Sequence, residues 1–290
     1  MAAATSCFRY NFALVSRIAN SFGEKSSFDL KSGAFLDIEK ARREHEDLVD
    51  TLRRIGVDVI ELPCDEKHPD GLFVDDIAVV INGTALICNP PEIDGRPSRQ
   101  GEMAVVRQVL RKELGLKICE VETDRASLEG GDVLWTGREI FVGISRRTNM
   151  AGAQAVAKAF PEYPTTIVKV PSPCVHLKDC VSMCGPEVMA VSKTKHAQAL
   201  FNEMRNLGGS GYKYIGVEED EAANVLYCNG TLVHLGSHLI PKGFAAFENK
   251  IDYPRVAIAM EEPLKRGGRI GSCVLMVSRV RHPKKFPISS

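Results

Sequence analysis

The stretch "IAVVINGTALIC", residues 77–88, places an Asn-Gly pair between two short apolar runs. Asn-Gly in this setting is a strong signal for a two-residue β-hairpin with a type I′ turn, because both turn positions need a positive φ. The same arrangement recurs in "VLYCNGTLVHLG", residues 225–236, and a glycine turn leads into "GREIFVGIS", residues 137–145. The sequence therefore predicts hairpins that recur along the chain.

The hairpins belong to a longer repeat. Each unit has a polar or glycine-rich connection followed by an apolar strand, for which "VMAVS" (188–192) is the candidate in the third unit. The repeat length is about 50 residues, as in known repeat architectures. Before each connection stands a short run rich in β-branched residues: "DVIEL" (58–62), "KICEV" (117–121), "TTIVKV" (165–170), "KYIGV" (213–217) and "RVAIAM" (255–260).

Amphipathic helices close most of these units. Residues 37–56 begin with Asp37 as a candidate N-cap, place their apolar residues along one stripe and end on Gly56. Residues 98–115 and 194–208 show the same helical period and also end on glycine.

We therefore predict an α/β propeller of five blades, each a ββαβ unit, around a central pocket. A single unit is too small to bury its own sheet face, and a closed ring of five units solves this problem. We expect one domain, residues 1–290, with a core from about 11 to about 280 and short flexible termini. The alternative is a doubly wound α/β sheet, but its helices would alternate with single strands rather than with hairpins.

The composition excludes several classes of function. Lys+Arg and Asp+Glu both number 37, so the formal net charge is zero and we expect no nucleic-acid partner. No apolar run is long enough to span a membrane. The nine cysteines form no disulfide framework, so we expect reduced thiols in a cytoplasmic protein. An N-terminal transit peptide is the alternative, because no acidic residue precedes Glu24.

The polar residues that could do chemistry lie in the connections of the repeat. In a ring these connections meet near the axis, so their side chains would share one pocket. Taken singly, the acids could be solvated or capping residues, and the histidine could be a core residue. The candidates are Asp70, Phe73, Asp75 and Asp76 in the first connection, Glu129 and Asp132 in the second, His176 in the third and Cys273 in the fifth.

Together these residues would provide a nucleophile, a general acid or base and carboxylates for a cation. Two or more carboxylates suit a guanidinium, because its planar fork pairs with them in a bidentate manner. Arg99 and either Arg146 or Arg147 could bind a carboxylate at the other end of the substrate, although each could be a surface residue instead.

Metal and cofactor signals are weak. His234 and His238 have a metal-like spacing but no third ligand nearby, and Cys174, Cys180 and Cys184 are too irregularly spaced for a zinc site. The sequence also has no glycine motif for a dinucleotide or a nucleoside triphosphate. We therefore expect neither a metal nor an organic cofactor.

Three stretches closely resemble the dimethylarginine dimethylaminohydrolases of the guanidino-modifying pentein superfamily: "ELPCDEKHPDGLFVDDIAVV" (61–80), "SLEGGDVLWTGREIFVGISRRTN" (127–149) and "VHLKDCVSM" (175–183). The resemblance implies a five-bladed α/β propeller. It also implies a hydrolase that converts dimethylarginine and monomethylarginine to citrulline and methylamines, and so relieves inhibition of nitric oxide synthesis. A small-molecule substrate, no cofactor, and a monomer or homodimer are implied as well.

The resemblance also implies two groups of site residues. In the substrate-binding group, Asp76 would bind the guanidinium, Asp70 and Asp75 would line the pocket, and Phe73 would pack on the planar guanidinium. Arg99 and Arg147 would bind the α-carboxylate. The catalytic group would contain the general acid and base, the residue that orients it, and the nucleophile, namely His176, Glu129 and Cys273.

The stretch "RGGRIGSCVLMVSR", residues 266–279, departs from the family pattern. Family members commonly have Cys-x-Ser before an apolar pair, and an ungapped alignment puts Gly271 at the cysteine position and Cys273 at the serine position. A shift of two residues moves a side chain about 6–7 Å along a strand, so Cys273 could attack only from a rearranged turn. Two hypotheses stay open. In the first, the protein is a hydrolase of methylated arginine, or of a related substrate such as citrulline, that acts through a covalent thiouronium on Cys273. In the second, it is a non-catalytic protein that binds a guanidino or ureido amino acid or has a regulatory role.

Overall fold

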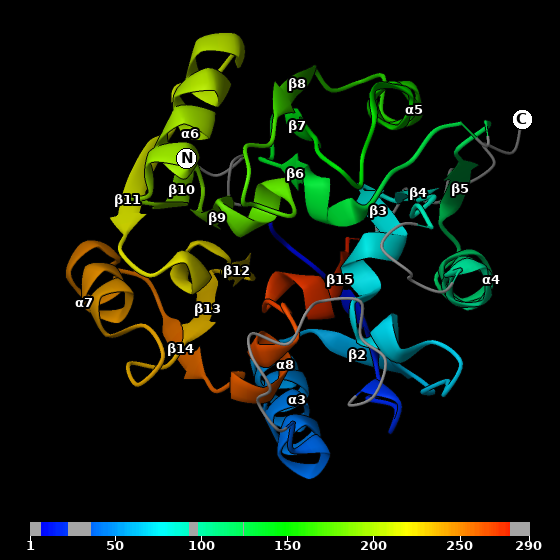
Figure 1. Cartoon of the computed structure of the whole chain (residues 1–290), viewed down its shortest axis with the longest axis horizontal. Coiled ribbons are helices and arrows are strands. Elements are labelled where there is room, and N and C mark those ends of the chain that lie inside the picture. The colour runs from blue at the N-terminus through cyan, green and yellow to red at the C-terminus, as the bar shows by residue number, and fades with distance from the viewer. Residues whose placement is uncertain (1–6, 23–35, 93–97, 124, 279–290) are drawn as a thin grey trace, which may run out of the picture.

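The computed structural model describes residues 7–22, 36–92, 98–123 and 125–278. These residues form five three-stranded sheets around a common centre, with helices at the periphery (Figure 1). The predicted five-bladed α/β propeller is therefore confirmed. The predicted flexible termini lie outside the described residues.

All five blades share one strand order, in which the middle strand pairs antiparallel with one neighbour and parallel with the other. Four blades follow one another along the chain: β3 (Ala78–Ile81), β4 (Thr84–Ile87) and β5 (Lys117–Glu120); β6 (Val133–Trp135), β7 (Ile140–Ile144) and β8 (Thr165–Lys169); β9 (Val181–Gly185), β10 (Val188–Ser192) and β11 (Lys213–Val217); β12 (Leu226–Cys228), β13 (Thr231–Leu235) and β14 (Arg255–Ile258).

The remaining blade closes the ring. It consists of β15 (Leu275–Val277), β1 (Phe12–Ser16) and β2 (Asp58–Leu62), with Phe12 opposite Val277 in the antiparallel pair. Strands from opposite ends of the described chain thus share one sheet, which joins the two ends of the ring.

A helix links the middle strand of each blade to its parallel neighbour, because parallel strands need a crossover connection. The Asp37 carboxylate accepts a hydrogen bond from the backbone N–H of Lys40, which confirms the predicted N-cap. The crossover helices are α3 (Ile38–Arg54), α4 (Gln100–Gln108), which a π-helical turn (Val109–Glu113) extends, α5 (Met150–Ala159), α6 (Lys195–Leu207) and α7 (Pro241–Lys250), and a short helix, α8 (Glu261–Lys265), follows β14.

The Asn-Gly hairpins have the predicted backbone. Asn82 and Gly83 have φ values of 46° and 83°, and Asn229 and Gly230 have φ values of 50° and 84°. Two consecutive positive φ values are the mark of a type I′ turn.

One strand assignment from the sequence is wrong. "VMAVS" is β10, the middle strand of its blade, and β9 is the strand that follows the connection. The turn between β9 and β10 lacks the Asn-Gly signal. It places a non-glycine residue, Glu187, at a positive φ of 62° instead. The sequence therefore contains no local signal for this hairpin.

The connections end in five 3₁₀ turns that gather at the centre of the ring (Figure 1). Neighbouring turns contact one another, so the predicted convergence of the connections is confirmed. Each turn comes shortly before the strand that pairs antiparallel with the middle strand of its blade: η3 (Val74–Ile77), η5 (Gly130–Asp132), η6 (Leu177–Asp179), η7 (Asp220–Ala223) and η8 (Gly271–Cys273).

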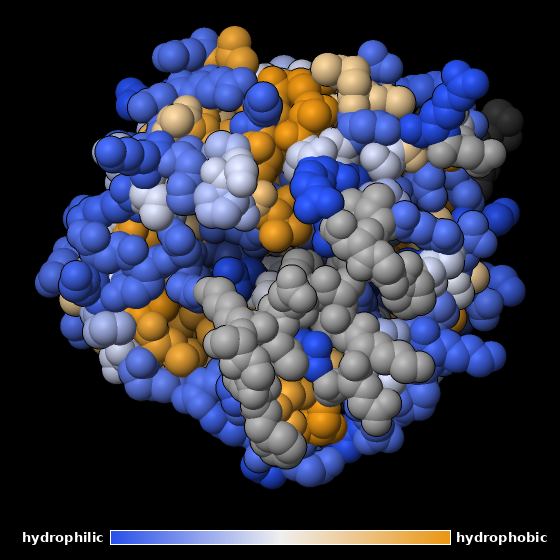
Figure 2. Space-filling model, viewed as in Figure 1, coloured by the Kyte–Doolittle hydropathy of each residue, from blue (hydrophilic) through white to orange (hydrophobic). Residues whose placement is uncertain are grey.

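The core fills the space between the sheets and the helices. In α3, Ala41, Leu48 and Leu52 lie on one face and are fully buried, and burial of each leucine contributes roughly 1.5–3 kcal/mol. The face in Figure 2 is mainly hydrophilic, and its apolar side chains form separate patches. Among the described residues, no helix combines the length and apolar character needed to cross a bilayer.

Candidate active site

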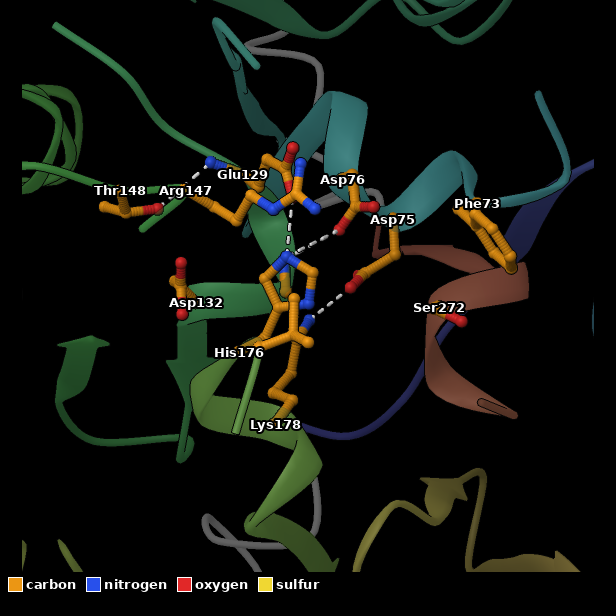
Figure 3. Close-up of polar contacts among 12 residues, drawn as sticks. Phe73, Asp75, Asp76, Glu129, Asp132, Arg147, Thr148, His176, Lys178 and Ser272 are labelled. Atoms are coloured by element: carbon orange, nitrogen blue, oxygen red, sulfur yellow. Dashed lines mark hydrogen bonds and ion pairs between the residues drawn. The ribbon is translucent and has the colours of Figure 1, made fainter. Parts of the chain in front are cut away.

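Glu129 and His176 occupy equivalent positions, because each comes directly before the 3₁₀ turn of its blade. His176 Nε2 lies 2.6 Å from Glu129 Oε2, and both side chains are buried (Figure 3). The Asp179 carboxylate accepts hydrogen bonds from the backbone N–H groups of Val175 and His176, at 3.2 and 2.9 Å. The imidazole therefore has a fixed backbone and one fixed acidic partner.

Asp76 is the second carboxylate beside the imidazole. Its Oδ1 lies 3.9 Å from His176 Nε2 and accepts a hydrogen bond of 3.3 Å from the Gly131 backbone N–H. A Cβ at Gly131 would come within 2.8 Å of the His176 ring and 3.0 Å of Asp76 Oδ1. A Cβ at Gly130 would lie only 1.9 Å from the Asp75 carbonyl oxygen. The Gly-Gly pair thus allows the close approach of η3, η5 and η6.

The carboxylates around His176 favour the protonated form of its imidazole. Burial opposes the imidazolium charge, but Asp76, Glu129 and Asp132 outweigh burial and raise the pKa of His176 to about 10. Burial in turn raises the pKa of Asp132 to about 6, against the favourable effect of His176. Asp132 accepts hydrogen bonds from Ser145 Oγ at 2.6 Å and from the Leu177 backbone N–H at 3.0 Å, so it also supports the turn after His176.

Asp75 has a partner that sequence reasoning missed. Its Oδ2 lies 2.5 Å from Lys178 Nζ, as Figure 3 shows below His176. Burial raises the pKa of Asp75, and the ammonium of Lys178 opposes this rise. Lys178 stands two residues after His176 in the "VHLKD" stretch, which was the available signal.

A cavity of about 320 Å³ brings several candidates together. Phe73, Asp76 and His176 line it, and Ser272 lies across it from His176 in the close-up (Figure 3). Phe73 is held edge-on against Phe22, with ring centroids 6.1 Å apart. The cavity thus offers Asp76, His176 and the Phe73 ring to a ligand, and Asp179, Asp220, Lys265 and Arg269 add further charges to its lining.

The two predicted carboxylate-binding arginines differ in setting. Arg99 is buried, and its Nη2 donates to the backbone carbonyls of Asp70 and Phe73 at 3.1 and 3.0 Å and pairs with Glu102 at 2.6 Å. Arg99 Nη1 lies 3.4 Å from Asp76 Oδ2. These contacts connect η3 with the start of α4. Among the residues that the structure describes, Arg99 is not part of the lining of the His176 cavity. A direct contact with substrate stays a prediction for this residue.

Arg147 is the inward-facing member of its pair. It is buried, whereas Arg146 is exposed. Figure 3 shows its guanidinium reaching toward Glu129, above the His176 ring. The α-carboxylate role of Arg147 also stays a prediction. Asp70 is buried beside Arg266, whose charge interacts with it, and the described cavity lining does not include Asp70.

Cys273 is fully buried in the hydrophobic core, and the described cavity lining includes Ser272 in its place. Burial raises the pKa of Cys273 to about 12; Ser272 opposes this rise, and Asp76 and Asp75 add to it. The Ser272 hydroxyl accepts from the Arg269 N–H and donates to the Arg269 carbonyl, both at 2.8 Å. Attack by Cys273 therefore requires a different conformation of this turn.

Gly271 lies on the other side of the turn. Its backbone N–H donates to Asn224 Oδ1 at 2.8 Å, and it lines a second cavity of about 130 Å³ together with Asp75 and Lys178. The position that aligns with the family cysteine thus faces away from the His176 cavity.

The expectation that all cysteines are reduced is wrong for one pair. Cys174 and Cys180 form a disulfide that brackets His176 in the sequence. Sequence reasoning missed it because neither residue belongs to a recognisable framework.

Neither the pair of His234 and His238 nor the acidic cluster around His176 suits a metal ion. His234 packs against Phe244 and Phe247, whereas His238 is exposed and lies 3.1 Å from Glu261 Oε1, so the two histidines share no site. Ligand atoms of Asp76, Glu129 and His176 lie within 4.8 Å of one another and could surround a cation. A protonated imidazole cannot bind a metal, however, and the raised pKa of His176 opposes that use of the site.

The chain is similar in sequence to one family of known proteins. The family model described as "N,N dimethylarginine dimethylhydrolase, eukaryotic" matches residues 19–239. The human protein described as "Putative hydrolase DDAH2" is 35% identical over 255 residues, which cover 85% of this chain and 87% of that protein.

Solved structures support the fold. DDAH from Pseudomonas aeruginosa, a cysteine-to-serine mutant complexed with citrulline, superposes with a TM-score of 0.77 at 22% identity and covers 93% of this chain and 100% of its own. The N-terminal domain of ArgZ, covalently bound to a reaction intermediate, superposes with a TM-score of 0.76 at 16% identity and covers 92% of this chain and 97% of its own. At these identities the likeness concerns the fold alone.

Proposed function

This chain belongs to the dimethylarginine dimethylaminohydrolase family of hydrolases that act on carbon–nitrogen bonds, and from this we propose that it converts N-ω-methylated arginines to citrulline and a methylamine. One observation supports the proposal most strongly. Two buried carboxylates, Asp76 and Glu129, lie within 3.9 Å of His176 Nε2 and raise the pKa of this imidazole, and His176 lies at the wall of a cavity that Phe73 also lines. The carboxylates suit a planar guanidinium cation, and the imidazole can donate a proton to the amine that leaves it during hydrolysis.

The substrate guanidinium would pair with Asp76 and pack against Phe73. Asp75 and Asp70 would add negative potential from the surrounding turns, while Lys178 limits the net charge of the set. The α-carboxylate would bind Arg147, with Arg99 supporting Asp76 from behind. Binding would replace water around the guanidinium with fixed charges.

The reaction needs two steps. The Cys273 thiolate would attack the guanidinium carbon, and protonated His176 would donate its proton to the departing dimethylamine, which leaves a covalent thiouronium on sulfur. Neutral His176 would then take a proton from water, and hydroxide would add to the same carbon. The carbon–sulfur bond would break to release the thiolate, and the added hydroxyl would lose its proton to solvent as citrulline forms. Glu129 would orient the imidazole in both steps.

Cys273 must reach the cavity for the first step. The hydrogen bonds between Ser272 and Arg269 would open, and Gly267, which has a positive φ of 75°, would provide the freedom for the turn to rearrange. A cationic substrate beside Asp76 would offset the carboxylates that raise the pKa of the Cys273 thiol. Substrate binding and activation of the nucleophile would thus be coupled.

Citrulline release from asymmetric dimethylarginine tests this proposal. The wild-type protein should release citrulline and dimethylamine in equal amounts, and Cys273→Ser should release neither. Cys64→Ser removes an exposed thiol and should leave the rate unchanged. Equal rates for wild type and Cys273→Ser would overturn the assigned nucleophile.

A second candidate function is binding of a guanidino amino acid without hydrolysis. The observation in its favour is the full burial of Cys273 together with its raised pKa. Calorimetric binding of dimethylarginine by wild type, lost in Asp76→Asn and accompanied by no citrulline release, would establish this function. Relief of inhibition of nitric oxide synthesis, a cytoplasmic location and a monomeric or homodimeric state remain predictions.

A further inference from the structure

A second cluster of reactive side chains lies at the wall of the His176 cavity. Cys174 and Cys180 flank His176 along the chain, and His196 comes from the first turn of α6. The ligand atoms of these three residues lie within 4.8 Å of one another, and all three line the same cavity. None of them has a part in the reaction proposed above.

The chemistry of this cluster matches a soft or borderline divalent cation. Two cysteine thiolates and one imidazole are ligands that Zn²⁺ prefers, and a fourth position can be taken by water or a carboxylate. Asp220 also lines the cavity and could supply that carboxylate. Open space beside the three ligands gives an ion a route to them.

The surroundings of His196 also suit a ligand. Its Nε2 lies 3.0 Å from Thr194 Oγ1, and Thr194 Oγ1 lies 3.0 Å from Ser192 Oγ. Ser192 Oγ donates to Asp220 Oδ1 at 2.5 Å. This chain of polar contacts fixes the orientation of the ring through Nε2, as outer partners of metal-bound histidines do, and the proposed site would use the other ring nitrogen, Nδ1.

We propose that Cys174, Cys180 and His196 form a zinc-type metal site that the disulfide closes and reduction opens. A dithiol reductant would supply two electrons and two protons to the disulfide and would itself become a disulfide, which leaves two thiols on the protein. Each thiol loses one proton when its sulfur binds the ion. The disulfide and the metal are thus alternative states of the same two sulfurs.

The position of the site adds a consequence. Because Cys174 and Cys180 bracket His176, an ion bound to them lies at the wall of the cavity that holds the imidazole. The sequence alone did not reveal this cluster, since its third ligand follows a β-hairpin and belongs to the next helix.

Cobalt titration tests the proposal without reference to hydrolysis. The full-length protein is reduced with a phosphine, freed of excess reductant under anaerobic conditions and titrated with Co²⁺. We expect one equivalent to bind with a thiolate-to-cobalt charge-transfer band that Zn²⁺ removes, and we expect no such band from the oxidised protein. Cys174→Ser and His196→Asn should each weaken binding by more than the roughly 10- to 100-fold that loss of an outer partner costs.

Two control variants make the test decisive. Cys64→Ser, at an exposed thiol, and Cys273→Ser should both retain the band, and circular dichroism should show that all variants are folded. No thiolate band in the reduced protein would overturn the proposal. So would a band that survives in both Cys174→Ser and His196→Asn, or one that Cys273→Ser abolishes, because the ion would then bind elsewhere.

Discussion

Replacing Glu129 by Gln should lower the pKa of His176, because the substitution removes the closest negative charge. His176 Nε2 and Glu129 Oε2 are 2.6 Å apart and buried. A hydrogen bond to a charged group contributes roughly 1.5–3 kcal/mol, against roughly 0.5–1.5 kcal/mol for a neutral one. The difference of about 1–1.5 kcal/mol equals about one pKa unit. The pKa of His176 should therefore fall from about 10 by at least that amount.

The pH dependence of stability should change in the same direction. The folded pKa of His176 is raised above the ordinary value of 6.5, so its contribution to stability is complete below about pH 6.5 and is lost as pH rises through about 10. Glu129→Gln should reduce this contribution, and the deficit in unfolding free energy should shrink as pH rises through that window.

Nuclear magnetic resonance titration of the His176 ring and urea unfolding at several pH values measure both effects. Glu248→Gln changes an exposed acid and should alter neither quantity. An unchanged His176 titration in Glu129→Gln would refute the reasoning, because Asp76 and Asp132 would then account for the whole shift.

Two further predictions concern the turns around the imidazole. Gly131→Ala would place a Cβ within 2.8 Å of the His176 ring, so it should cost roughly 1–3 kcal/mol of stability and abolish dimethylarginine binding. Gly209→Ala has open space around its Cβ and should change neither quantity. Urea unfolding measures the stability, and calorimetry measures the binding. Lys178→Met would leave the Asp75 carboxylate buried without its cation and should cost roughly 3–5 kcal/mol near neutral pH. It should raise the pKa of Asp75 further, so the loss should decrease on acidification, and a pH-independent loss would contradict the ion-pair explanation.

The parts of the fold that depend on local chemistry were predictable. The Asn-Gly pairs at 82–83 and 229–230 predicted hairpins that the structure confirms. The β9–β10 hairpin was missed because its turn relies on Glu187 at a positive φ, which sequence patterns rarely indicate. The predicted ring followed from the repeat, since each unit needs neighbours to cover its sheet.

The site was predictable where the repeat brought residues to equivalent positions. Glu129 and His176 precede successive 3₁₀ turns, and the structure places them in contact. The pairing of Lys178 with Asp75 and the placement of His196 beside Cys174 depend on packing between separate elements, which no local pattern reveals. The same holds for the burial of Cys273, which depends on how one glycine-rich turn packs into the ring.

Trapping of the covalent intermediate tests most directly whether Cys273 attacks the substrate. S-methyl-L-thiocitrulline carries a thiolate leaving group that needs no proton, so His176→Gly should still form the thiouronium but hydrolyse it slowly. We predict that peptide mass analysis finds the adduct on Cys273, and that Cys273→Ser forms none. Binding of the compound without an adduct, or an adduct on Cys174 or Cys180, would show that Cys273 is not the nucleophile.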